Sequence, residues 1–270
     1  MFVEVQTRFG AFPKRFLVVF CLMTFSGNAF AEDPTRILFI GNSYTQQIRS
    51  TVKNMIFRSP HKSVVLEFVA PGGKTLAFHS QQQSTLDRIR NGKWDIVVLQ
   101  DQSQTPAVYP KRFLQASKQL HQIISETGAA TAYYQTWGRR DGDQSNRERF
   151  GTYASMQAAL NKAYQSAAVR DDAILVPVGE VWQKIRQLNP GIGKSLYRKD
   201  GSHPSANGAY LAGLCFYCWL LKGDPEDLRF SGQVDATTQS ICRKVVHQVI
   251  SEKASALEDE PSNPTDAAHD

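Results

Sequence analysis

The sequence lacks the marks of several large protein classes. Its 18 glycines and 12 prolines are close to average usage, which excludes a collagen-like or low-complexity chain. Neither a Gly-x-x-x-x-Gly-Lys-Ser/Thr loop nor a Gly-x-Gly-x-x-Gly loop is present, so nothing supports nucleotide binding. No compact stripe of lysine and arginine with interleaved aromatic residues occurs, and we predict no nucleic-acid partner. The 270 residues suit one medium-sized domain with a real core.

Cysteine is scarce, with four residues in the chain. Cys21 lies in an N-terminal apolar run, which leaves Cys215, Cys218 and Cys242 in the body. A single Cys-x-x-Cys without a second ligand pair is weak evidence for a metal site. We interpret these three residues as buried small apolar side chains, for which an exported location permits one disulfide-bridged pair, and we favour this over the alternative of redox or metal chemistry. We predict neither a metal nor an organic cofactor.

The N-terminal apolar run, Phe16 to Phe25, is short. A helix needs about 20 apolar residues to cross a bilayer, so this run cannot span one. Basic residues precede it and Ala29-Phe30-Ala31 follows it, a pattern typical of a signal peptide cut after Ala31. We therefore expect residues 1–31 to be removed and the protein to be periplasmic or secreted, without stable membrane insertion. An uncleaved anchor is the alternative.

Charge is distributed unevenly along the chain. Residues 1–31 carry a net charge of +2, and residues 258–270 contain five acidic and no basic residues, so the body between them carries +9. We expect an acidic, disordered tail over 255–270 and a single domain over 32–254. A mildly basic body favours anionic surfaces or substrates.

Apolar segments alternate with amphipathic ones through this domain. The pattern predicts strands at 36–40, 63–70, 95–99, 129–135 and 173–178, and helices at 44–58, 75–91, 111–126, 146–168, 179–188, 205–221 and 236–253. This alternation indicates a three-layer α/β/α, flavodoxin-like fold with a parallel sheet of about five strands. Sheets of this kind bind ligands in the crevice beyond the carboxyl ends of their strands, so the chemistry should lie there.

A serine follows the first predicted strand, in Gly41-Asn42-Ser43. At a helix N-terminus its own N–H group is free, and the helix dipole favours developing negative charge. These properties suit a nucleophile whose tetrahedral intermediate carries an oxyanion. A simple helix cap is the alternative interpretation of Ser43.

A serine nucleophile needs a base, and the base needs an orienting carboxylate. Asp200 and His203 lie three residues apart, on a predicted loop before the helix at 205–221. The other histidines lie in predicted helices, surface stretches or the tail. We therefore predict a catalytic triad of Ser43, His203 and Asp200.

The ordered segments resemble the SGNH hydrolase superfamily, also called GDSL-like esterases. That family has its serine in a Gly-Asp-Ser block, an oxyanion glycine after the second strand, an amide after the third, and Asp-x-x-His near the C-terminus. The matching segments here are Ile40–Thr45, Ala70–Leu76, Val98–Ser103 and Asp200–Ser205. The match is nearest to a branch with Gly-Asn-Ser in the first block.

The resemblance also implies an oxyanion hole. Its members would be the N–H groups of Ser43 and Gly73 and one side-chain amide, from Gln102 or, as second choice, Gln100. Two departures matter: Asn42 replaces the family's aspartate, and the third block lacks Gly-x-Asn-Asp. The choice between the two glutamines stays open.

The resemblance implies a serine esterase that removes a small acyl group, possibly acetyl, from a small molecule, a carbohydrate or a cell-envelope polymer. We place Trp137, Arg139 and Arg140 at the rim of the crevice, where the tryptophan could stack on a sugar and the arginines could meet an anionic group. A core tryptophan and a solvated loop are the alternative. A lipid esterase, an O-acyltransferase and a non-catalytic glycan-binding protein of the same fold remain rival functions.

Overall fold

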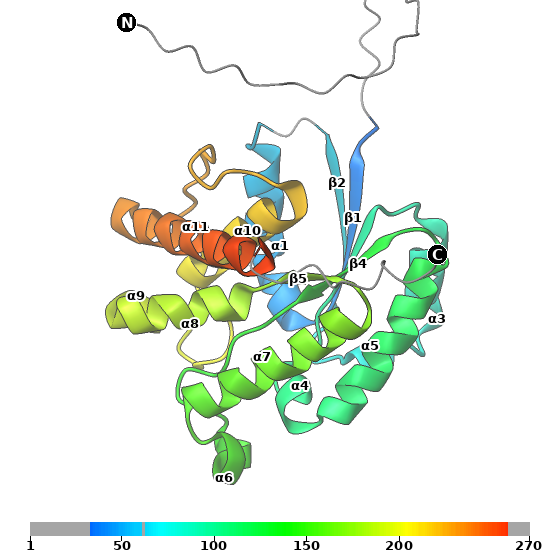
Figure 1. Ribbon diagram of the computed structural model, residues 1–270, viewed down its shortest axis with the longest axis horizontal. Coiled ribbons are helices and arrows are strands. Elements are labelled where there is room, and N and C mark those ends of the chain that lie inside the picture. Colours follow the sequence, from blue (N-terminus) through cyan, green and yellow to red (C-terminus); the bar gives the residue numbers. More distant parts are fainter. Residues whose placement is uncertain (1–32, 61–62, 259–270) are drawn as a thin grey trace, which may run out of the picture. The chain divides into compact units, whose positions relative to one another are not determined.

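The computed structural model describes residues 33–60 and 63–258. Its centre is one parallel sheet of five strands in the order β2-β1-β3-β4-β5 (Figure 1). This is the strand order of flavodoxin-like sheets, so the predicted fold class is confirmed. The strands are β1 (Thr35–Ile40), β2 (Val64–Val69), β3 (Ile96–Leu99), β4 (Ala130–Tyr134) and β5 (Ile174–Val176).

The central strands are continuous apolar runs because both faces of the sheet are covered. Successive side chains of β1 enter different cores: Ile37 and Phe39 pack on one side, and Leu38 and Ile40 on the other. Each of these four side chains is fully buried. The sheet therefore gives a rigid base to the loops that follow its carboxyl ends.

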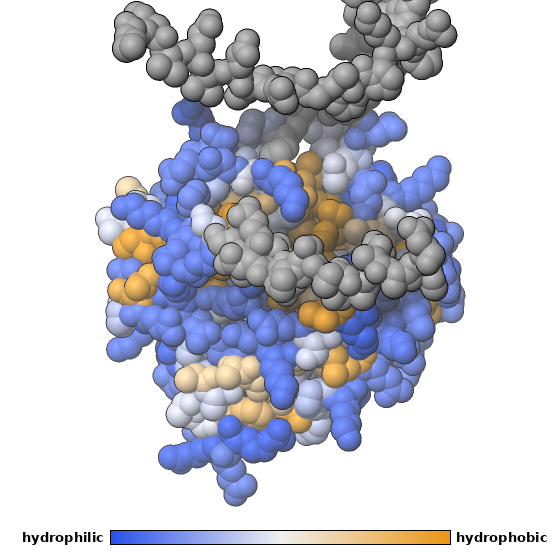
Figure 2. All heavy atoms as spheres, in the orientation of Figure 1, coloured by the Kyte–Doolittle hydropathy of each residue, from blue (hydrophilic) through white to orange (hydrophobic). Residues whose placement is uncertain are grey.

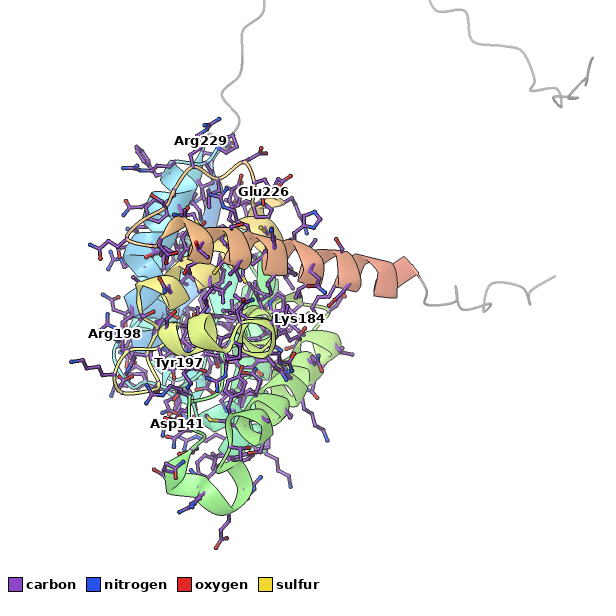
Figure 3. The ribbon with its side chains drawn as sticks, turned by 90° about the vertical axis from the view of Figure 1, so that its left-hand side faces the viewer. Asp141, Lys184, Tyr197, Arg198, Glu226 and Arg229 are labelled. Atoms are coloured by element: carbon purple, nitrogen blue, oxygen red, sulfur yellow. The ribbon has the colours of Figure 1, made fainter. Side chains whose placement is uncertain are left out.

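Helices cover both faces of the sheet. One layer contains α1 (Ser43–Phe57), α8 (Val178–Leu188), α10 (Ala206–Leu221) and α11 (Ala236–Glu258). The other contains α2 (Leu76–His79), α3 (Gln83–Asn91), α5 (Pro110–Ser125) and α7 (Tyr153–Arg170). Figure 3 shows α11 in orange across the first layer, near the labelled Lys184, whose Nζ lies 2.9 Å from Glu252 Oε1.

Short helical segments join these elements. They are α4 (Thr105–Val108), the 3₁₀ turn η1 (Gln144–Asn146), α6 (Arg147–Phe150) and α9 (Pro190–Ser195). None of the helices in the described part of the chain combines the length and the apolar composition that a bilayer-spanning helix needs. Figure 2 shows hydrophilic side chains over most of one face of the molecule.

Some boundaries differ from the predicted ones. The predicted helix 75–91 is two helices, because the chain leaves helical geometry over the polar residues 80–82. The predicted helix 146–168 is likewise divided at Gly151, and Thr152 caps its longer part through a capping box. The last helix runs to Glu258, so the first four residues of the predicted tail are helical. The predicted signal peptide, 1–31, and residues 259–270 lie outside the described residues.

The three cysteines of the described chain are free and buried. Burial raises the pKa of Cys218 and that of Cys242 to about 12, so both stay as neutral thiols. They fill space between α10 and α11, which agrees with the prediction of small apolar core residues.

Candidate active site

Ser43 is the first residue of α1, directly beyond the carboxyl end of β1. The helix cap is Asn42, whose Oδ1 accepts from Tyr44 N at 3.1 Å, so Ser43 itself is not needed as a cap. Before them, a Cβ on Gly41 would lie 2.3 Å from Thr45 Oγ1, and only glycine fits there. This tight turn leaves the Ser43 hydroxyl free for other partners.

The loop before α10 brings Asp200 and His203 to Ser43. His203 Nε2 lies 3.0 Å from Ser43 Oγ, and His203 Nδ1 lies 2.7 Å from Asp200 Oδ2. Both distances are within reach for proton transfer from a nucleophile to an oriented base. Ser43 and Asp200 are 157 positions apart in the sequence. In the structure the three predicted triad residues form one hydrogen-bonded chain.

Backbone groups hold the Asp200 carboxylate in place. Its Oδ1 accepts from the N–H of Ser202 at 2.9 Å and of His203 at 3.0 Å. Partial burial acts to raise the pKa of Asp200, but the hydrogen bonds from Ser202 and His203 outweigh it and lower the pKa overall. An ionised carboxylate at this position fixes the orientation of the imidazole and stabilises its protonated form.

Trp137 does not lie at the rim of a crevice, and its predicted role in stacking on a sugar is wrong. The side chain is fully buried, because Tyr44 stacks on the ring at 4.9 Å and Trp182 stacks on it at 3.9 Å. Its Nε1 donates to Ser202 O at 3.0 Å. Trp137 is therefore a positioning residue for the loop that carries Asp200 and His203.

A small pocket of about 210 Å³ opens beside the triad. Gly73 lies on its wall with a φ of +69°, a conformation that favours glycine, and its N–H has no acceptor among the described residues. Gln102 lies on the same wall. The structure thus brings Ser43, Gly73, Gln102 and His203 to one pocket, which is lined by Asn42, Ser43, Tyr44, Gly73, Gln102, Ser103, Arg139, Ser202 and His203.

Gln100 is not available to an oxyanion. The side chain is fully buried, and its Oε1 accepts from Asn42 N at 3.0 Å and from Thr45 Oγ1 at 2.8 Å. Its Nε2 donates to Asn42 Oδ1 and to the carbonyl of Asp101. Every polar atom of this amide is engaged by Asn42, Thr45 or Asp101, so the second-choice assignment of Gln100 to the oxyanion hole is wrong.

Asp101 joins the two loops that carry Gly73 and Gln102. Its Oδ1 accepts from Leu76 N at 3.0 Å and from Gln102 N at 2.6 Å, while Oδ2 is buried without a partner among the described residues. Burial raises the pKa of Asp101 to about 6, although both hydrogen bonds act in the opposite direction. Sequence reasoning missed this residue, yet one signal was present: a charged side chain directly after an apolar strand and Gln100.

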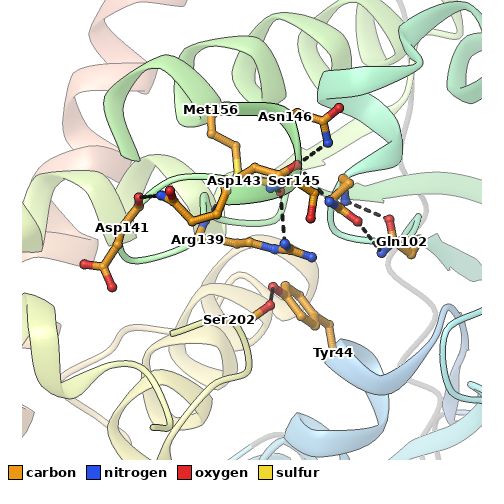
Figure 4. Close-up of polar contacts among 11 residues, drawn as sticks. Tyr44, Gln102, Arg139, Asp141, Asp143, Ser145, Asn146, Met156 and Ser202 are labelled. Carbon is orange, nitrogen blue, oxygen red and sulfur yellow. Dashed lines mark hydrogen bonds and ion pairs between the residues drawn. The ribbon is translucent and has the colours of Figure 1, made fainter. Parts of the chain in front are cut away.

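The two predicted arginines lie differently. Arg139 lines the pocket, and its guanidinium pairs with Asp143 at 3.1 Å (Figure 4). Arg140 is not among the lining residues, and its Nε pairs with the exposed Asp141 at 2.9 Å. Only one member of the predicted pair therefore faces the reacting groups. No cluster of histidine, cysteine, aspartate and glutamate suited to a metal ion occurs among the described residues.

Solved structures with this architecture are similar to the chain. A protein described as "a putative SGNH hydrolase from Slackia heliotrinireducens" is 26% identical, with a TM-score of 0.59 over 70% of this chain and 100% of that one. A DUF4886 family protein from Bacteroides uniformis is 17% identical, with a TM-score of 0.65 over 82% and 96% of the two chains. The acetyl xylan esterase AlAXEase is 12% identical, with a TM-score of 0.52 over 67% and 98%.

No protein-family model and no curated protein sequence matches the chain. The structural similarity at 26% identity spans the whole of the Slackia protein. It agrees with the flavodoxin-like sheet and with the order of the four motif segments. The chain therefore belongs to the SGNH hydrolase superfamily.

Proposed function

We propose that the protein is an exported serine esterase that removes a small acyl group, such as acetyl, from a carbohydrate or a cell-envelope polymer. The observation that carries this proposal is the hydrogen-bonded chain from Ser43 Oγ through His203 to Asp200. The same hydrogen-bonded arrangement of serine, histidine and aspartate activates a serine nucleophile in enzymes of unrelated fold. It is therefore identified by its geometry and not by the fold that carries it. Export rests on the signal peptide predicted for residues 1–31.

The first half-reaction forms an acyl-serine. Ser43 Oγ attacks the ester carbonyl carbon while His203 Nε2 takes its proton, and the oxyanion accepts hydrogen bonds from the N–H groups of Ser43 and Gly73 and from the Gln102 amide. The bond from the carbonyl carbon to the alcohol oxygen then breaks. His203 returns the proton to that oxygen, and the alcohol leaves.

The second half-reaction restores the enzyme. Water attacks the acyl carbon while His203 Nε2 takes one of its protons, and a second oxyanion forms in the same hole. The bond from carbon to Ser43 Oγ breaks, and the proton passes from His203 to Oγ. The products are a carboxylic acid and the free serine, so the atoms balance with water as the only co-substrate.

The pocket supports a short acyl group. Its volume of about 210 Å³ is below the roughly 300–1,000 Å³ of pockets that enclose drug-sized ligands. None of its lining residues has an aliphatic side chain. The pocket therefore offers a long acyl chain no aliphatic side chains to pack against. This favours an esterase for short acyl groups over a lipid esterase. The acetyl xylan esterase among the structural neighbours shows that this architecture can host such an activity.

Covalent labelling tests the proposed function. A fluorophosphonate probe should label the purified protein, and Ser43→Ala should abolish the label. Ser103→Ala is the matched control, because Ser103 lines the same pocket but has no bond to His203. Unchanged labelling of the Ser43→Ala protein would refute the assignment. Acetate release in water, compared with acetyl transfer to an added sugar, separates a hydrolase from an O-acyltransferase.

A further inference from the structure

Arg139 is the only charged side chain of fixed sign among the residues that line the pocket. A guanidinium has five N–H donors, and among the described residues one hydrogen bond uses them: Nη1 donates to Asp143 Oδ1 at 3.1 Å. Its Nε is buried and has no acceptor among the described residues. The group therefore keeps unused donors beside Ser43 and His203, where the side chain is 27% exposed.

Asp143 anchors this guanidinium through the ion pair with Nη1. Its carboxylate is fully buried and accepts from Gln104 Nε2 at 2.8 Å and from Asn146 Nδ2 at 2.7 Å, besides Arg139 (Figure 4). Burial acts to raise the pKa of Asp143, but hydrogen bonds from Gln104 and Asn146 and the charge of Arg139 lower it overall. The anchor is thus ionised and saturated with donors.

This arrangement orients the guanidinium more than a surface ion pair would. Taking a carboxylate and a guanidinium out of water costs desolvation free energy. Neutral side chains could make a purely structural contact without this cost. Here the carboxylate is buried, while the guanidinium remains open to the pocket. None of the described residues that line the pocket is an aspartate or glutamate, and Asp143, which pairs with Arg139, is not among the lining residues.

We propose that Arg139 binds an anionic group of the substrate, a carboxylate, phosphate or sulfate next to the scissile ester. This inference rests on the proposed esterase function and names its substrate class. The planar fork of a guanidinium suits such oxyanions, because two parallel N–H groups can bind two oxygens at once. Arg140 takes no part, since its side chain pairs with Asp141 outside the pocket.

Matched pairs of esters test the inference. The first pair is 4-acetoxybenzoate and its neutral isostere 4-acetoxybenzamide, which differ in charge on the alcohol side. The second is mono-4-nitrophenyl glutarate and 4-nitrophenyl pentanoate, which differ on the acyl side. We expect wild type to prefer the anionic member of one pair in kcat/KM, and Arg139→Gln to reduce that preference about tenfold to hundredfold. The pair that responds shows which side of the ester carries the charge.

Two controls separate the inference from the proposed function. Arg140→Gln removes a neighbouring positive charge from the same loop and should leave the preference unchanged. Binding of 4-acetoxybenzoate and 4-acetoxybenzamide to the Ser43→Ala protein, by calorimetry, measures charge recognition without catalysis. Binding preference with no hydrolysis would refute the esterase and support the role of Arg139. Equal kinetics within both pairs, together with equal binding of 4-acetoxybenzoate and 4-acetoxybenzamide, would overturn the inference, even if Ser43 reacts with the fluorophosphonate.

Discussion

Replacing Asp101 by asparagine should remove a pH-dependent part of the free energy of unfolding. The Asp101 side chain is fully buried, and one of its oxygens has no partner among the described residues. Asparagine keeps an oxygen that can accept from the N–H groups of Leu76 and Gln102, which lie 3.0 and 2.6 Å from Oδ1. The substitution therefore changes charge while it conserves the shape that joins the two loops.

The magnitude follows from the pKa of this carboxyl. Its pKa is raised from 3.8 to about 6, and at about 1.4 kcal/mol per pH unit the difference corresponds to about 3 kcal/mol. The folded protein binds this proton more tightly than the unfolded chain does. The contribution of Asp101 to stability is therefore fully present below about pH 4 and is lost as the pH rises through about 6.

Urea unfolding, followed by tryptophan fluorescence from pH 4 to pH 8, measures this contribution. The stability of Asp101→Asn relative to wild type should increase by about 3 kcal/mol across that range, since the variant lacks the titrating group. The unpaired amide of the variant costs about 1–3 kcal/mol at every pH and cancels from the slope. Asp87→Asn, which changes an exposed carboxylate on α3, controls for loss of one charge. A relative stability that stays constant within about 1 kcal/mol would refute the reasoning.

Three further outcomes are expected. Gly41→Ala should destabilise the protein by about 1–3 kcal/mol in urea unfolding, because the new Cβ would overlap Thr45 Oγ1 and Gln100 Oε1. A variant as stable as wild type would contradict this close packing. Trp137→Phe should lower kcat about tenfold with little change in KM, because the hydrogen bond to Ser202 O is lost. The circular dichroism spectrum should stay intact. An unchanged kcat would show that the loop needs no such support. N-terminal sequencing of the exported protein should begin at residue 32, directly after Ala31, and recovery of intact protein in the membrane would favour an anchor.

The fold was predictable because its central strands β1 and β3 are covered on both faces and so are short, continuous apolar runs. Helix interruptions were harder to predict, since residues 80–82 are polar and compatible with either a helix or a turn. The triad residues were predictable because their residue types occur in the order of the family's motif segments. The surroundings of Trp137 were not predictable from the sequence. Its ring faces are covered by Tyr44 and Trp182, which come from distant segments.

The choice between the two glutamines shows the same limit. Gln100 and Gln102 both follow β3, and their spacing does not reveal which one is enclosed. The answer depends on Asn42, whose backbone and side chain occupy the polar atoms of Gln100. Asn42 Nδ2 also donates to Lys74 O at 2.9 Å, which an aspartate could not do. This bond gives a physical reason for the departure from the family's usual Gly-Asp-Ser block.

The column of stacked rings has a consequence for heat inactivation. Tyr44 belongs to the nucleophile's helix, Trp137 follows β4, and Trp182 lies on α8, so one column joins three parts of the core. Tyr44 Oη lies 2.7 Å from Ser202 Oγ and Trp137 Nε1 donates to Ser202 O, so the column also holds the loop that carries His203 close to Ser43. Loss of activity on warming should therefore coincide with cooperative melting of the whole domain, with no temperature interval in which a folded but inactive enzyme accumulates.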